Sequence, residues 1–286
     1  MKKLFFCISL FLFSIFTLYS QTIKIEKSYS LSANIQKGFH PVLNTNGSLL
    51  AFTSESYQGL AVYDFSNKST LKISDEPGAG FQPVFSDDNK LHFKNTVYKS
   101  NLKYEGLKSY DLQKKTIREE LEPQRNLRSA LNYGANNKGT TQRAWSDGRN
   151  LNIEKDGKIE ILNPVENANG YIWASLSPDK KMILFNAVSV GTFVADLKGN
   201  IIASLGYLNA PVWYDNEFVA GMQDKDDGYN ITESKVIIKN LAGSITKILS
   251  EPDQIAMYPT ASSVAGKIAY NTIEGDIYIL EIEVKK

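Results

Sequence analysis

A short motif recurs along this chain at intervals of roughly 40–50 residues, and this repeat limits the possible folds more than any other feature. Its clearest copy is residues 171–185, YIWASLSPDKKMILF, in which two apolar strands flank a Ser-Pro-Asp turn followed by two lysines. Weaker copies are FHPVLNTNGSLLAF from Phe39, FQPVFSDDNKLHF from Phe81, APVWYDNEFVAGM from Ala210 and MYPTASSVAGKIAY from Met257. Repeats of this length are typical of solenoids and propellers.

The spacing of the repeat selects a propeller. With Pro41 as the marker of the first unit, the separations between successive units are 42, 46, 45, 37 and 48 residues. The equivalent positions are Pro83, Ser129, Ala174, Pro211 and Pro259. Each interval suits one four-stranded blade, and strand-like runs alternate with turn sequences inside it. The expected hairpin turns are Ser66-Asn67-Lys68, Asp156-Gly157, Lys198-Gly199-Asn200 and Ala242-Gly243.

The two ends of the repeat array complement each other. The last unit lacks one strand, whereas residues 22–32, TIKIEKSYSLS, precede the first unit without a blade of their own. We therefore predict an all-β, six-bladed β-propeller, in which the N-terminal strand closes the last blade. Closure of the ring leaves no large exposed sheet edge. Residues 21–286 form this one domain, and no helix is expected in it.

Residues 1–20 have the pattern of a signal peptide: Lys2 and Lys3, an apolar run of 16 residues, and Ser20 before the expected cleavage point. An uncleaved anchor is the alternative, although the run is shorter than the ~20 residues that span a bilayer. The only cysteine, Cys7, lies in this run, so the mature chain has no disulfide or thiol chemistry. The predicted location is the periplasm of a Gram-negative cell or the extracellular medium, with no membrane span after cleavage.

The charge of the chain argues against a nucleic-acid partner. Removal of Lys2 and Lys3 with the signal leaves 30 basic against 31 acidic side chains, a net charge of −1. Electrostatic binding of nucleic acid requires a basic patch, and the sequence shows no cluster of Lys and Arg.

The pattern Pro-x-[Phe/Leu/Trp]-Ser-Pro-Asp-x-Lys-x-[Ile/Leu]-x-Phe resembles the TolB-type six-bladed propeller repeat, a WD-like repeat with a Pro-Asp turn. The fourth unit matches best, the third hardly at all, and the resemblance spans nearly all of residues 21–286. Members of this family include periplasmic interaction modules, propeller caps of serine peptidases and a few sugar lyases, so the fold does not choose the function.

The repeat also predicts which residues surround the mouth of the central channel. In a propeller, the loops that enter the inner strands share one face with the loops between second and third strands. Residues just before the marker should ring this mouth: His40, Gln82, Arg128, Trp173 and Tyr258, with Asn209 beside the small Ala210 of the fifth unit. A ring of long polar and aromatic side chains is a default binding site. The alternative is that these side chains only cap the channel and pack blade against blade.

Two second-to-third-strand loops are further candidates on this face. Residues 223–233, QDKDDGYNITE, place Asp224, Asp226, Asp227 and Asn230 around a glycine, as calcium-binding loops do, but the spacing does not match an EF-hand. A solvated acidic hairpin without metal is therefore the preferred interpretation, and a calcium site is the alternative. Residues 97–109 are predicted to form a long loop carrying Tyr98, Lys99, Lys103, Tyr104 and Lys108, either a partner-binding flap or a tolerated insertion.

The sequence offers little for catalysis. His40 and His92 are the only histidines, too few for a multi-histidine metal site or for the histidine cluster of the family's lyases. A Gly-x-Ser-x-Gly elbow and a hydrolase domain are absent from the sequence. A pair of carboxylates for glycoside chemistry stays open, because a sequence cannot show their separation.

We therefore expect an exported, non-catalytic propeller that acts as a protein-interaction scaffold in the cell envelope and binds an envelope protein or glycan at the channel mouth, without a required cofactor. The alternative is a carbohydrate-binding or carbohydrate-cleaving propeller that uses the same face. A purely structural envelope component is a third possibility.

Overall fold

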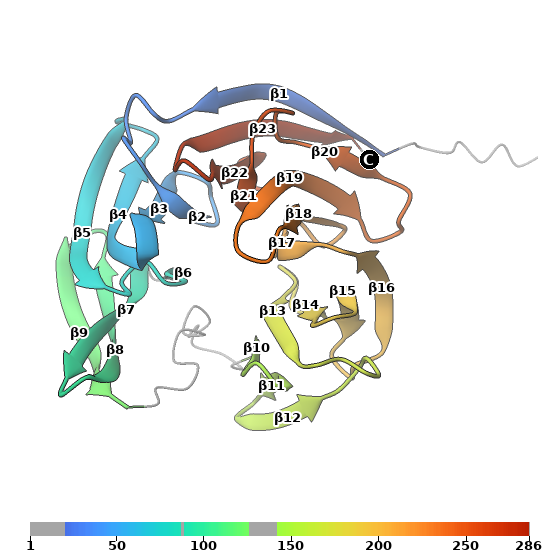
Figure 1. Ribbon diagram of the computed structural model, residues 1–286, viewed down its shortest axis with the longest axis horizontal. Coiled ribbons are helices and arrows are strands. Elements are labelled where there is room, and N and C mark those ends of the chain that lie inside the picture. Colours follow the sequence, from blue (N-terminus) through green and yellow to red (C-terminus); the bar gives the residue numbers. More distant parts are fainter. Residues whose placement is uncertain (1–20, 87–88, 126–141, 286) are drawn as a thin grey trace, which may run out of the picture.

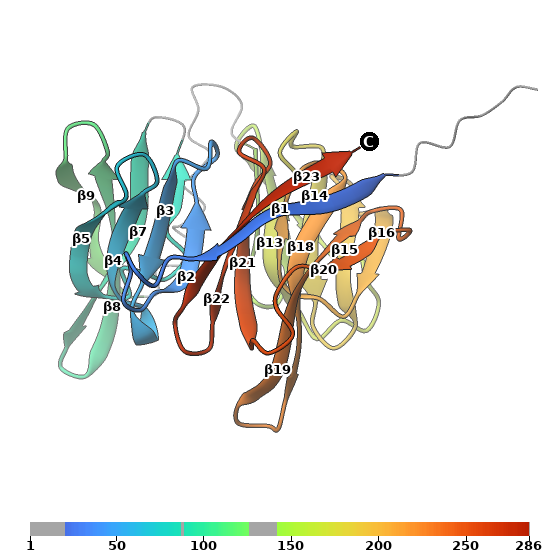
Figure 2. The same ribbon diagram turned by 90° about the horizontal axis from the view of Figure 1, so that it is seen from above.

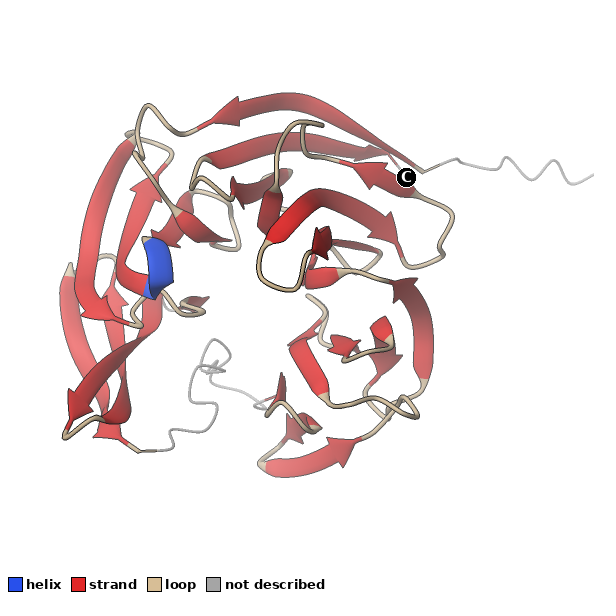
Figure 3. Ribbon diagram, in the orientation of Figure 1, coloured by secondary structure: helices blue, strands red, loops and turns tan. Residues whose placement is uncertain are grey.

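The computed structural model describes residues 21–86, 89–125 and 142–285, and these form six antiparallel sheets around a common axis (Figure 1). The protein is thus an all-β, six-bladed propeller, as the repeat predicts. The single helical element described is the short 3-10 turn η1 (Glu55–Tyr57), drawn in blue in Figure 3. Within the described residues, no helix is both long and apolar enough to cross a membrane. The signal sequence predicted for residues 1–20 lies outside the described residues.

Each blade takes its strands in chain order, from the inner strand outward. Blade 1 consists of β2 (Phe39–Leu43), β3 (Leu49–Thr53), β4 (Gln58–Asp64) and β5 (Ser69–Pro77), and blade 2 of β6 (Val84–Ser86), β7 (Lys90–Lys99), β8 (Leu102–Asp111) and β9 (Thr116–Gln124). Blade 3 is described as three strands, β10 (Gln142–Ser146), β11 (Leu151–Lys155) and β12 (Lys158–Leu162). The expected marker of this blade, Ser129, and the neighbouring Arg128 lie outside the described residues.

The remaining blades follow the same order, except that the N-terminal strand of the chain is the outermost strand of blade 6. Blade 4 consists of β13 (Tyr171–Leu176), β14 (Met182–Ala187), β15 (Gly191–Asp196) and β16 (Ile201–Gly206), and blade 5 of β17 (Asn209–Trp213), β18 (Phe218–Asp226), β19 (Ile231–Asn240) and β20 (Thr246–Ile248). Blade 6 consists of β21 (Ala256–Ser262), β22 (Lys267–Thr272), β23 (Ile277–Lys285) and β1 (Thr22–Ser30). The four predicted hairpin turns all connect consecutive strands.

The N-terminal strand closes the ring, as predicted. β1 pairs antiparallel with β23 from Thr22 opposite Lys285 to Ser30 opposite Tyr278, with one bulge after Ile25. Figure 2 shows the two strands running side by side along blade 6. Ile23 packs into the apolar cluster between blades 5 and 6. The outer edge of β23 is therefore covered by the other end of the chain.

Alternation along the second strand of each blade joins neighbouring blades. In β14, Ile183 and Phe185 point into a cluster with Leu151 and Ile153 of blade 3, whereas Leu184 packs with blade 5. Successive side chains of a strand point to opposite faces, so one apolar strand contributes to two blade interfaces. The core is consequently a series of clusters between blades.

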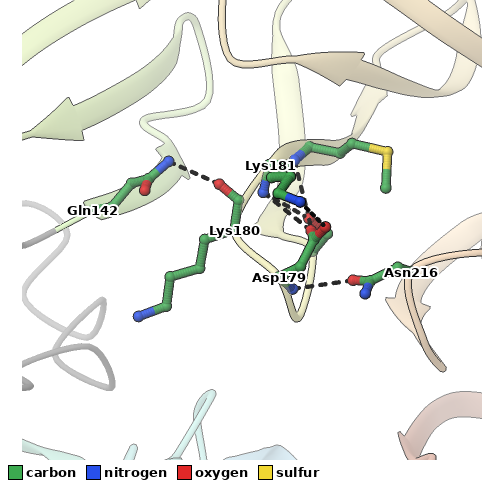
Figure 4. Close-up of polar contacts among 7 residues, drawn as sticks. Gln142, Asp179, Lys180, Lys181 and Asn216 are labelled. Carbon is green, nitrogen blue, oxygen red and sulfur yellow. Dashed lines mark hydrogen bonds and ion pairs between the residues drawn. The ribbon is translucent and has the colours of Figure 1, made fainter.

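The Ser-Pro-Asp turn between β13 and β14 fastens three blades together (Figure 4). The backbone N–H of Asp179 donates to Oδ1 of Asn216 in blade 5 (3.0 Å), and Nε2 of Gln142 in blade 3 donates to the carbonyl oxygen of Lys180 (2.9 Å). Inside the turn, the Ser177 hydroxyl donates to Oδ1 of Asp179 (2.7 Å). The best copy of the repeat thus has a structural role, at the end of β13 away from the channel mouth.

Aspartates in the hairpin turns are expected to make the fold less stable in acid. Six of them accept hydrogen bonds from nearby side chains or backbone N–H groups, which hold their pKa values below the ordinary 3.8: Asp64, Asp111, Asp147, Asp179, Asp196 and Asp227. A carboxyl whose pKa is lowered by folding stabilises the fold above its unfolded pKa and loses this contribution as the pH falls through the folded value.

We therefore expect the free energy of unfolding in urea to be nearly constant from pH 7 to about 5 and to decrease below about pH 4. The variant Asp196→Asn, in the β15–β16 turn, should show a smaller decrease than the parent protein. A free energy of unfolding that does not change between pH 5 and pH 3 would contradict this assignment.

Candidate functional site

The inner strands open on one face into a cavity of about 350 Å³. In Figure 1 these strands, β2, β6, β13, β17 and β21, surround the centre of the ring. The cavity is lined by the beginnings of these strands and by one residue of η1: His40, Pro41, Val42, Tyr57, Phe81, Gln82, Pro83, Trp173, Ala210, Pro211, Val212, Tyr258 and Pro259. We call it the mouth cavity.

The backbone takes the same unusual conformation at five places around the mouth cavity. The residue before each described marker has a positive φ: His40 (49°), Gln82 (50°), Trp173 (52°), Ala210 (42°) and Tyr258 (52°). In four of the five blades the strand pairing shifts register at this point, as in a β-bulge. The left-handed region costs an L-residue about 1–2 kcal/mol, and bulges redirect side chains. Such strain clusters at binding and active sites, which makes the mouth the first candidate for function.

The structure brings most of the predicted mouth residues together. His40, Gln82, Trp173 and Tyr258 line the cavity. Asn209 does not line it: Ala210 occupies the equivalent left-handed position, and Asn209 stands one residue earlier. Arg128 lies outside the described residues. That any of these residues binds a ligand stays a prediction.

One side of the cavity is a continuous row of aromatic rings. The His40 ring lies 4.0 Å from the Tyr258 ring and 4.4 Å from the Tyr57 ring, and the Phe81 ring meets Tyr57 edge-on at 5.1 Å. Nζ of Lys94 lies over the Phe81 ring, 4.8 Å from its centre. Aromatic contacts of this kind stabilise a fixed arrangement by about 0.5–1.5 kcal/mol per pair. The row is therefore a rigid wall of the cavity.

Burial keeps this row uncharged. It lowers the pKa of His40 to about 4, so the imidazole is neutral at pH 7. Burial also raises the pKa of Tyr57 and of Tyr258, so both hydroxyls keep their protons. The cavity thus presents neutral, largely apolar walls with a few polar atoms at the edges.

Sequence reasoning missed two members of the row. Phe81 could have been found, because Phe81-Gln82-Pro83 repeats the order of Phe39-His40-Pro41. Tyr57 has no counterpart in the repeat, and it reaches the mouth from η1, where Ser56 and Tyr57 both have positive φ. Figure 3 shows this turn on the inner side of blade 1.

A polar group stands beside the cavity on blade 5. Nδ2 of Asn209 donates to Oδ1 of Asp224 (2.9 Å) and to the Tyr207 hydroxyl (3.0 Å), which in turn donates to Oδ2 of Asp224 (3.3 Å). Burial and the negative charge of Asp224 both raise the pKa of Tyr258. Asp224 is half-buried, and its charge therefore acts on the mouth cavity.

The other candidate calcium ligands serve the hairpin itself. Oδ1 of Asp227 accepts the backbone N–H groups of Tyr229 (2.9 Å) and Asn230 (2.8 Å), and Oδ1 of Asp226 accepts that of Gly228 (2.9 Å). Within the described ranges, no group of three or more His, Cys, Asp or Glu side chains could hold a metal ion. Calcium binding at this hairpin stays a prediction.

The prediction of a long loop at residues 97–109 was wrong. β7 and β8 pair continuously up to Lys99 opposite Leu102, and only Ser100 and Asn101, both with positive φ, form the turn. This hairpin and the β18–β19 hairpin project from the same side of the ring (Figure 2). Both are linked to the mouth, one by Lys94 on Phe81 and the other by Asp224 on Asn209. Their ends expose Tyr98 (65%) and Tyr229 (95%).

His92 is a packed residue of β7, as the sequence indicates. It is buried, and its Nε2 lies 3.1 Å from Oγ of Ser86, whose hydroxyl donates to the carbonyl oxygen of Lys90. Ser86 occupies the repeat position that Ser177 occupies in blade 4. The contact therefore belongs to a turn and not to the mouth.

Comparisons with known proteins support the fold assignment and give no information on function. No protein-family model and no curated protein matches the chain. Among solved structures, U3-55K is similar over 89% of this chain and 98% of its own, with a TM-score of 0.55 at 8% identity. The β-propeller domain of Cps50 (Swd1) from Myceliophteria thermophila is similar over 91% and 99%, with a TM-score of 0.52 at 12% identity. A chain of the mitotic checkpoint complex is similar over 98% of both chains, with a TM-score of 0.51 at 10% identity. The class that fold and comparisons define together is the β-propeller.

Proposed function

We propose that this chain is an exported, non-catalytic β-propeller of the TolB type. It acts as a protein-interaction scaffold in the envelope of a Gram-negative cell and binds its partner through the mouth face. The signal-like pattern of residues 1–20 and the Ser-Pro-Asp repeat support export and the TolB-type assignment.

The observation that carries the proposal is the strained aromatic lining of the mouth cavity. At this one place, five residues at or next to the starts of the inner strands have a left-handed conformation. Tyr and Trp in a pocket are the residues that most often dominate the energy of protein interfaces. The β7–β8 and β18–β19 hairpins project from the same side of the ring (Figure 2). They therefore offer a protein partner additional contact surface next to the cavity.

The solved propellers bear on this choice only through the fold. One of the similar chains comes from the mitotic checkpoint complex, which is a protein assembly. At 10% identity this likeness extends to the fold alone. The chemistry of the partner must therefore be inferred from the residues at the mouth of this chain.

A carbohydrate ligand is the second candidate. Gln82 lines the cavity, and Asn209 and Asp224 stand beside it, so amide and carboxylate groups lie close to aromatic rings. This combination of rings and polar side chains also suits a sugar. A protein partner explains the two projecting hairpins as well, and we therefore prefer it.

The test is capture of a partner from envelope extract at high salt, with identification by mass spectrometry. Tyr258→Ala and Trp173→Ala should each weaken binding of the purified partner by about 2 kcal/mol or more, roughly 30-fold in Kd. Ile202→Ala, on the exposed side of β16, is the matched control and should bind as the parent does. Thermal stabilisation by oligosaccharides, without any captured protein, would overturn the scaffold proposal in favour of the carbohydrate one.

A further inference from the structure

The mouth cavity has two unlike sides. On the side of blades 1 and 2, the aromatic row ends under a cation of the chain itself, because Lys94 covers Phe81. That cation has a counter-ion, since Nζ of Lys94 lies 3.9 Å from Oε1 of Glu105, an oxygen that it shares with Lys103 (2.9 Å). This side already contains a complete arrangement of ring, cation and carboxylate.

On the side of blades 4, 5 and 6, two rings line the cavity and a carboxylate, Asp224, stands beside it on blade 5, without a cation among the described residues. Trp173 and Tyr258 line the cavity there and pack on one small cluster that contains Met222 and Met257. In the described part of the chain, no Lys or Arg lies over either ring. Asp224, on the blade between them, accepts hydrogen bonds from neutral Asn209 and Tyr207, and no described Lys or Arg forms an ion pair with it.

These groups together suit a positive charge. The face of an aromatic ring attracts a cation, more strongly where water is displaced. A half-buried carboxylate that has only neutral donors gains a further, charge-assisted hydrogen bond when a cation arrives. We propose that this side of the mouth cavity receives a lysine or arginine side chain of the partner protein, held between Trp173, Tyr258 and Asp224. The proposal rests on the proposed function and specifies the chemistry of the partner.

The charges of the two hairpins favour the same orientation. The β18–β19 hairpin carries Asp224, Asp226, Asp227 and Glu233 against Lys225, a net charge of −3 over residues 223–233. The opposite β7–β8 hairpin carries Lys99 and Lys103 against Glu105, a net charge of +1 over residues 97–105. Complementary fields guide association, and like charges exclude the wrong orientation. A basic partner segment is therefore attracted to blade 5 and repelled by blade 2.

The experiment uses the mature full chain and four capped tripeptides as probes: Ac-Gly-Arg-Gly-NH₂, Ac-Gly-Lys-Gly-NH₂, Ac-Gly-Gln-Gly-NH₂ and Ac-Gly-Glu-Gly-NH₂. Saturation-transfer NMR titrations report the Kd of each. We expect the arginine and lysine peptides to bind about tenfold or more tightly than the glutamine and glutamate peptides. Equal binding of all four peptides, or binding of none, would overturn the proposal.

Variants locate the site. Asp224→Asn keeps the shape of the side chain and should weaken binding of the arginine peptide about tenfold. Trp173→Leu, which keeps an apolar side chain but removes the ring, should weaken it at least about threefold, and serves as the second variant should Asp224→Asn disturb the hairpin. The control is Asp156→Asn, which removes the same charge in the β11–β12 turn and should leave the Kd unchanged. An unchanged Kd in both Asp224→Asn and Trp173→Leu would refute the site.

The outcomes separate this inference from the function it rests on. Suppose that a captured partner is lost with Tyr258→Ala but binds Asp224→Asn normally, and that the peptides do not discriminate by charge. Then the scaffold function stands and the cationic side chain is wrong. If the arginine peptide binds as expected but envelope extract yields no protein that depends on Tyr258, the cation site stands and the scaffold function fails.

Discussion

Deletion of residues 22–30 is expected to lower the melting temperature by more than about 10 °C and to make the protein associate. The deletion removes β1 and its ladder with β23, and it exposes the edge of a long strand to other chains. It also removes Ile23, which is only 7% exposed, from the cluster between blades 5 and 6. An Ile→Ala change at such a site alone costs about 2–5 kcal/mol, and each kcal/mol corresponds to roughly 2–4 °C in a domain of this size.

The strand makes further contacts that the deletion would remove or disturb. Nζ of Lys247 in β20 donates to the carbonyl oxygen of Ile23 (2.6 Å), and Nδ2 of Asn240 donates to Oε1 of Gln21 (3.2 Å). These bonds tie the N-terminal strand to blade 5 as well as to blade 6. Loss of β1 should therefore weaken the blade 5–6 interface and not only the outer edge of blade 6.

Circular dichroism melts and size-exclusion chromatography would measure both effects. Addition of a synthetic peptide of residues 21–32 should restore much of the melting temperature, because binding to the folded state alone stabilises it. Glu26→Ala, an exposed position of the same strand, should change little. A truncated protein that melts like the parent and stays monomeric would show that ring closure does not require β1.

The sequence predicts the architecture well because the fold depends on features that a sequence contains. Four strands per unit follow from apolar alternation, and turn sequences such as Asp156-Gly157 carry the positive φ that a two-residue hairpin needs. The missing strand of the last unit leaves only residues 22–32 to supply it. Each of these inferences needs only neighbouring residues in the sequence or the number of strands in a unit.

The extent of the β7–β8 hairpin could not be predicted in the same way. Its end is exposed on both faces, so no apolar alternation identifies residues 97–105 as strand. The turn consists of Ser100 and Asn101 without the glycine that usually identifies such a turn. Backbone hydrogen bonds between β7 and β8 hold the end of this hairpin, and such bonds require no particular pattern of side chains in the sequence.

The candidate site was predicted in position but not in detail. Counting back one residue from the marker finds His40, Gln82, Trp173 and Tyr258, because the left-handed backbone conformation recurs with the repeat. In blade 5 the small Ala210 takes the bulge position, and the polar residue before it makes a different contact. Tyr57 depends on the conformation of a loop, and Asp224 on a hairpin of another strand. Proximity of this kind arises only when the ring closes.

Phe185→Ala is expected to lower the free energy of unfolding by about 3–5 kcal/mol. Phe185 is fully buried between blades 3 and 4, where its ring lies 5.6 Å from Tyr171 and 6.1 Å from Phe193. The change loses the transfer free energy of the buried ring. It also leaves a cavity that the stiff paired strands on either side can fill only partly, and this cavity adds a further cost.

Equilibrium unfolding in urea would measure the effect, with Ile161→Ala as the control. Ile161 belongs to β12 of blade 3 and is 59% exposed, so its loss should change the free energy by less than about 0.5 kcal/mol. Phe185 does not line the mouth cavity. The variant should therefore still bind the partner at temperatures where it is folded, which separates stability in the blade interfaces from recognition at the mouth. A loss below about 1 kcal/mol would mean that the interface between blades 3 and 4 is not the close-packed contact described above.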